Sequence, residues 1–69
     1  MEVYDVTWTD VNNKETLGKA FRYQLVNLIT DLLFDKNIKC FSVQNSEGRI
    51  IYSTTPEGDI MDDSDLVFN

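Results

Sequence analysis

Apolar and polar residues alternate along the first part of the chain. In residues 2–9, EVYDVTWT, the apolar side chains of Tyr4, Val6 and Trp8 fall at every second position. β-Branched and aromatic residues are frequent in this segment, and a period of two is typical of a strand with two different faces. The pattern therefore predicts a β-strand over residues 2–9.

The next segment carries large apolar residues at spacings of three and four. Asn12 followed three residues later by Glu15 resembles a capping box, the arrangement that marks many helix starts. Asn37 suits the left-handed residue that ends a helix. The pattern predicts one long amphipathic helix over residues 14–35, with Gly18 on its buried side. The stripe expected to face the core is Leu17, Phe21, Leu25, Leu28, Ile29 and Leu32.

Two further strand-like segments follow. IKCFSVQN (38–45) and RIIYSTT (49–55) flank the tripeptide SEG, which fits a hairpin loop with Gly48 in the left-handed conformation. Pro56 and Gly58 then indicate a turn. After that turn the chain is expected to form a short turn or helix and an extended end.

The predicted order is β-α-β-β, within a single small α+β domain over residues 1–69. We expect one long helix packed on a three-stranded mixed sheet, whose first two strands run parallel through a right-handed crossover. Both sheet faces carry apolar residues, and one helix can cover only one of them. The other face is expected to be covered by a second copy of the chain or by the tail residues Leu66, Val67 and Phe68.

Charge is distributed unevenly. The chain has 12 acidic and 6 basic residues, for a net charge of −6, and residues 57–69 form an acidic tail segment without any base. Nucleic-acid binding needs clustered cations, so this composition argues against direct contact with DNA or RNA. The tail acids could instead imitate nucleic-acid phosphates and occupy a basic groove of another protein. They are Glu57, Asp59, Asp62, Asp63 and Asp65.

The residues that usually carry out catalysis are few. The chain has no histidine, and its one cysteine, Cys40, lies in a predicted strand, where a buried structural thiol is expected. The acidic run lacks the spacing, central glycine and closing glutamate of a calcium loop, and no glycine-rich phosphate loop is present. We therefore expect no enzyme activity, no catalytic residue, no metal site and no cofactor. A lone cysteine, with no apparent leader or membrane span, favours a cytoplasmic protein.

The outer side of the predicted helix is uncharged and carries two aromatic rings. Opposite the apolar stripe lie Thr16, Tyr23, Asn27, Thr30 and Phe34. Exposed aromatic residues with little charge around them are typical of interface centres, so this strip is a candidate site for a protein partner. The alternative for Phe34 is that it packs under the tail or the hairpin.

Two acids stand one turn apart near the predicted helix end. Negative charge near the C-terminus of a helix is unfavourable because it opposes the helix dipole. Residues that are unfavourable for the fold sometimes belong to a contact site, and Asp31 and Asp35 are two such residues. They are therefore added to the candidate partner-binding residues. The alternative is that Lys36 or Lys39 neutralises them.

Together these features predict a small non-enzymatic module that binds a protein partner, as an inhibitor or modulator of a larger cellular protein. Small acidic chains of this kind also resemble accessory proteins of bacteriophages, which implies action on a host enzyme in the host cytoplasm. Two alternatives stay open. One is the acidic nucleic-acid mimic, and the other is a structural homo-oligomer, such as a homodimer that pairs strand edges or an open sheet face.

Overall fold

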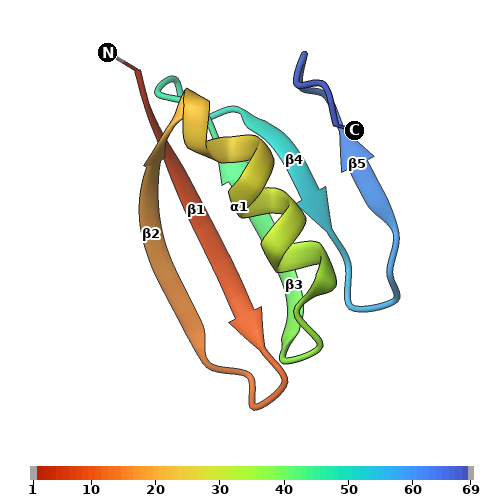
Figure 1. The fold of residues 1–69 in the computed structure, drawn as a ribbon. Coiled ribbons are helices and arrows are strands. Elements are labelled where there is room, and N and C mark those ends of the chain that lie inside the picture. Colours follow the sequence, from red (N-terminus) through yellow and green to blue (C-terminus); the bar gives the residue numbers. More distant parts are fainter. Residues whose placement is uncertain (1, 69) are drawn as a thin grey trace.

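An antiparallel sheet with a helix across one face makes up the fold (Figure 1). The computed structural model describes residues 2–68. All neighbouring strands in the order β2-β1-β3-β4-β5 run antiparallel. The elements are β1 (Val3–Asp10), β2 (Glu15–Phe21), α1 (Arg22–Phe34), β3 (Ile38–Gln44), β4 (Ile50–Thr54) and β5 (Ile60–Asp62).

The predicted three-stranded mixed sheet with a helix over residues 14–35 is wrong. Residues 15–21 form strand β2, and the helix begins only at Arg22. Leu17 and Phe21 are four residues apart, which fits one helix face but equally one strand face, because four is a multiple of two. The extra strand reverses the chain, so β1 and β3 are antiparallel neighbours instead of parallel ones.

The predicted capping box is in fact the turn of the β1–β2 hairpin. The Asp10 carboxylate accepts hydrogen bonds from the backbone N–H groups of Asn12 at 2.8 Å and Lys14 at 2.9 Å. Asn13 adopts the left-handed conformation with φ 65°, which asparagine tolerates better than most residues. These bonds close a tight turn where Asn12 and Glu15 were expected to start a helix.

The hairpin predicted around Gly48 is confirmed. Gly48 has φ 83°, and the Asn45 side-chain oxygen accepts hydrogen bonds from the N–H groups of Glu47 and Arg49 at 3.0 and 2.9 Å. A second tight turn ends at Gly58, with φ 94°, and leads into β5. The sequence pattern predicted that turn but not the short strand after it.

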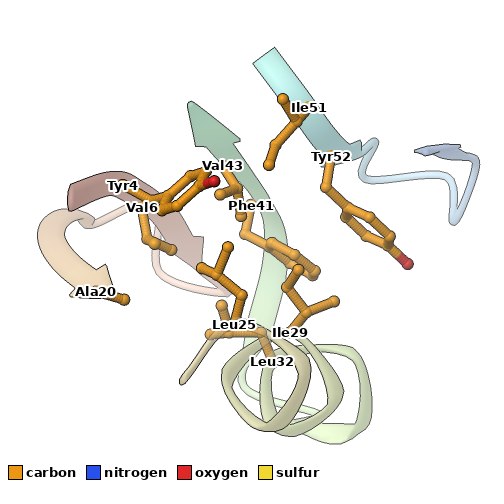
Figure 2. Packing of buried hydrophobic residues seen from close by; sticks show 10 residues of the cluster. All are labelled: Tyr4, Val6, Ala20, Leu25, Ile29, Leu32, Phe41, Val43, Ile51 and Tyr52. Atoms are coloured by element: carbon orange, nitrogen blue, oxygen red, sulfur yellow. The ribbon is translucent and has the colours of Figure 1, made fainter. Parts of the chain in front are cut away.

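The core fills the space between α1 and the sheet (Figure 2). Leu25 and Ile29 of α1 are fully buried, as are Val6 of β1 and Val43 of β3. The full cluster is Tyr4, Val6, Ala20, Leu25, Ile29, Leu32, Phe41, Val43, Ile51 and Tyr52. In β4 two consecutive residues join this cluster because the β3–β4 register shifts between Val43 and Gln44.

The tail packs on the helix side of the sheet, not on the opposite side. Leu66 and Phe68 are partly buried against the core, and the Phe68 ring lies 5.8 Å from the Tyr52 ring. The expectation that the tail covers the second face is therefore wrong. The residue Asn69 of the predicted tail segment lies outside the described residues.

The sheet face opposite α1, called here the open face, carries mostly small polar side chains. A row across its middle follows from the strand registers and consists of Leu17, Thr7, Ser42, Ser53 and Met61. Cys40 pairs with Thr9 on this face and is only half-buried, so its expected place in the core is also wrong. The hydroxyl groups of Thr7, Ser42 and Ser53 can meet water in the middle of this row, whereas Leu17 and Met61 at its two ends are exposed apolar residues.

Gly18 permits a close contact within the hairpin. It lies in β2 on the helix side, where an added Cβ would come within 3.1 Å of the Trp8 ring. The indole of Trp8 thus covers the glycine. Gly18 was predicted on the buried side of a helix, whereas it lies in a strand and its close neighbour is a tryptophan.

Candidate interaction surface

Four residues on the outward side of α1 form the surface that the sequence predicted, called here the helix strip: Tyr23, Asn27, Thr30 and Phe34. Tyr23 and Phe34 are 75% and 83% exposed. At 100° per residue the two rings lie within about 20° of each other around the helix, and at 1.5 Å per residue they lie roughly 16 Å apart along it. Phe34 does not tuck under the tail or the hairpin.

The remaining members of the helix strip are polar and uncharged. Asn27 is exposed, and the Thr30 hydroxyl is turned inward to donate a hydrogen bond to the Val26 carbonyl at 2.7 Å. Thr16, which the long predicted helix placed on this surface, belongs to β2 and is not part of it. The surface is therefore shorter than predicted.

Phe21 extends the aromatic surface beyond the helix. It was predicted as a core residue of a helix, but it ends β2, is exposed, and stacks on Tyr23 with ring centroids 6.1 Å apart. A shallow hollow beside Tyr23 is lined by Arg22, Val26 and Leu66. No sequence pattern indicated this hollow, because it depends on where the tail packs.

Asp31 and Asp35 are exposed at the C-terminal half of α1. Asp35 ends the helix, and its carboxylate accepts a hydrogen bond from the Asn37 N–H at 2.9 Å. Neither acid belongs to an ion pair found in residues 2–68, and Lys39 instead donates to the Asn13 side chain. The negative charge of Asp35 is unfavourable at the C-terminal end of the helix dipole. The hydrogen bond that its carboxylate accepts in this turn offsets that cost, without a neutralising lysine.

The acidic tail residues are divided between ion pairs and the solvent. Asp63 pairs with Arg49, and Asp65 pairs with Arg22 at 2.5 Å. Asp62 accepts hydrogen bonds from the backbone and hydroxyl of Ser64. Glu57 and Asp59 are exposed around the turn before β5. Two of the five tail acids are therefore paired with arginines, and the other three belong to no ion pair found in residues 2–68.

A chain of hydrogen bonds ties the tail to the N-terminal strand and to α1. The Ser46 hydroxyl and the Tyr4 phenol both donate to Glu2, at 2.9 and 2.7 Å. Arg22 donates to the Tyr4 oxygen at 3.3 Å and to Asp65. The hydrogen bond from Arg22 holds the pKa of Asp65 below its ordinary value, and the bond from Tyr4 does the same for the pKa of Glu2.

These lowered pKa values predict that acid loosens the tail. A carboxyl whose pKa is lower in the folded state stabilises the fold fully above its unfolded pKa, and the contribution is lost as pH falls through the folded pKa. We expect an Asp65→Asn variant to lose less stability than the wild type between about pH 5 and pH 2. Urea unfolding at a series of pH values, followed by Trp8 fluorescence, measures this.

Asp31→Asn is the matched control, because it removes an exposed acid that has no ion-pair partner. It leaves the Arg22–Asp65 ion pair in place, so the pH profile that this pair produces should remain that of the wild type. If Asp65→Asn also kept that profile, the Arg22–Asp65 contact would not contribute to the fold.

Within residues 2–68, no group of three or more acidic or cysteine side chains is arranged to hold a metal ion. No helix in this range combines the length and the apolar character needed to cross a membrane.

Comparisons with protein families, curated proteins and solved structures found no significant match to the chain. A function for this protein is therefore to be inferred from its own surface.

Proposed function

We propose that this chain is a non-enzymatic protein-binding domain, and that the helix strip is the centre of its contact surface. The observation that carries the proposal is the exposure of Tyr23 and Phe34 on the same side of α1. Aromatic rings left in water on a regular element bury a large area in a complex at little cost in conformational entropy.

The partner that fits this surface is a protein with an apolar groove. An outward helix face with anchors at its two ends is the form that docks into such grooves. The helix strip has no formal charge, and Asp31 flanks it as a solvent-facing rim residue. By filling a groove that a larger protein uses for its own contacts, the domain would inhibit or modulate that protein through occlusion.

The acidic mimic has less support as a function. Of the five tail acids, Asp63 and Asp65 are already paired with arginines of the same chain. Those pairs reduce the negative field that would have to attract a basic groove. Salt distinguishes the two functions, because a contact between charges weakens steeply with ionic strength and a contact between buried rings does not.

Tyr23→Ala tests the proposal. In a pull-down from bacterial lysate at low and high salt, we expect the wild type to retain a partner at both salt concentrations. The alanine variant should bind that purified partner about 2 kcal/mol more weakly, or roughly 30-fold in Kd, because an interface anchor is lost. Titration calorimetry measures this difference.

Tyr23→Phe is the matched control, since it keeps the ring and removes only the hydroxyl. It should bind almost as well as the wild type. A partner retained equally by the Tyr23→Ala and Phe34→Ala variants would show that the helix strip is not the contact surface. A partner lost from the wild type at high salt would favour the acidic mimic instead.

A further inference from the structure

Strand β2 forms an edge of the sheet that is open to a further strand. It hydrogen-bonds to β1 on one side, and in residues 2–68 no strand pairs with its other side (Figure 1). The β1–β2 ladder runs from Val3 opposite Phe21 to Thr9 opposite Glu15 without a bulge. The strand contains no proline. It therefore lacks two of the usual features that prevent edge pairing.

A lysine on an edge strand commonly discourages pairing with a second strand. Lys19 is the lysine of β2, and its ammonium group is held 2.6 Å from Asp5 of the neighbouring strand. The charge is directed over the sheet of its own chain. It therefore leaves the outer edge of β2 accessible.

The side chains of β2 on the open face form a pattern that is complementary to itself. Glu15, Leu17 and Lys19 follow one another at every second position, as an acid, an apolar residue and a base. Leu17 is 67% exposed, which leaves a large apolar side chain in water in the middle of a strand. Nothing in the packing of one chain accounts for this exposure.

We propose that β2 pairs antiparallel with β2 of a second copy of the chain, around a two-fold axis that passes between the two Leu17 residues. In this register Leu17 meets Leu17, while Glu15 of each chain lies opposite Lys19 of the other. An axis at Gly18 would instead set Leu17 against Lys19, and an axis at Lys19 would bring two lysines together. Only the register centred on Leu17 sets opposite charges against each other and an apolar residue against an apolar residue.

The pairing joins the two sheets into one antiparallel sheet with α1 of both copies on the same side. Each Lys19 then lies between Asp5 of its own chain and Glu15 of the partner, so one cation serves two carboxylates. The helix strip is not used in this contact. The inference therefore goes beyond the proposed function and does not depend on it.

Charge reversal tests the register with the full-length chain. Sedimentation velocity should show a reversible, concentration-dependent dimer for the wild type. Glu15→Lys sets lysine against lysine, and Lys19→Glu sets glutamate against glutamate. Each single variant should therefore raise the dimer Kd at least about tenfold. An equimolar mixture of the two variants should form a heterodimer about as stable as the wild-type dimer, because both pairs are opposite charges again.

A second measurement covers the case in which a charge variant unfolds. In a Cys40→Ser background, Leu17→Cys should form a disulfide-linked dimer on mild oxidation, because residues directly opposite each other bring their Cβ atoms close enough. Val67→Cys, equally exposed in the tail, should do so far more slowly.

Four results would overturn the proposal. The first is a wild type that stays monomeric at every concentration. The second is a dimer that survives both charge reversals. The third is a dimer that Tyr23→Ala dissolves. The fourth is a mixture of the two charge variants that associates no better than either alone.

Discussion

Replacing Phe41 by alanine is expected to lower the free energy of unfolding by about 3 to 5 kcal/mol. Phe41 is buried in the middle of the sheet and stacks on Tyr52 with ring centroids 5.8 Å apart, and Tyr52 in turn contacts the Phe68 ring. The substitution removes the first ring of this series and leaves a cavity. At roughly 0.05 to 0.15 kcal/mol per residue, a chain of 69 residues has a total stability of about 3 to 10 kcal/mol, so this loss is a large part of it.

Urea unfolding followed by the fluorescence of Trp8, the chain's one tryptophan, measures the loss. Cys40→Ala is the matched control, because Cys40 is the adjacent residue on the open face and is only half-buried. The control should change stability by less than about 1 kcal/mol. Equal losses for the two variants would mean that the helix side of β3 is not the core.

Ile29→Ala should cost about 2 to 5 kcal/mol. Ile29 is fully buried at the centre of α1 and belongs to the same cluster as Val6 and Val43 (Figure 2). Removing three carbon atoms there leaves a cavity between the helix and the sheet. Both elements are held rigid by backbone hydrogen bonds and cannot move together to fill it. The same urea measurement, together with loss of helical signal in circular dichroism, checks this result.

Phe34→Ala serves as the comparison within the same helix. Although it deletes more atoms than Ile29→Ala does, Phe34 is almost fully exposed, so its loss should change stability by no more than about 0.5 kcal/mol. A large cost for Phe34→Ala would show that the ring packs on the chain itself, and it would remove the main support for the helix strip.

Part of the fold could be predicted because its strands and turns follow from residues that are close together in the sequence. The alternation around Val6 predicted β1, and the glycine at position 48 predicted the β3–β4 hairpin. The prediction from the sequence was wrong between Asn12 and Phe21, because the turn there contains side-chain acceptors of the kind that cap a helix. Since Leu17 and Phe21 satisfy both periodicities, the choice depended on long-range pairing with β1, which local patterns cannot show.

The exposure of the aromatic residues on α1 was predicted better than the strands. Tyr23 and Phe34 are exposed on one helix side because the second half of the predicted helix is correct. Phe21 and Leu66 were missed, since their positions depend on where β2 ends and where the tail packs. The ion pairs of Asp63 and Asp65 could not be foreseen either, because their arginine partners are distant in sequence.

The order of the strands also bears on how fast the protein folds. Three of the four ladders join strands that are consecutive in the chain and linked by short turns, so each can form locally. The β1–β3 ladder instead brings residues 5–10 to residues 38–44, across β2 and α1. Closing this long loop costs chain entropy before any of its contacts form. The speed of folding therefore depends on how early α1 becomes helical, because a formed helix shortens the chain that separates these two strands.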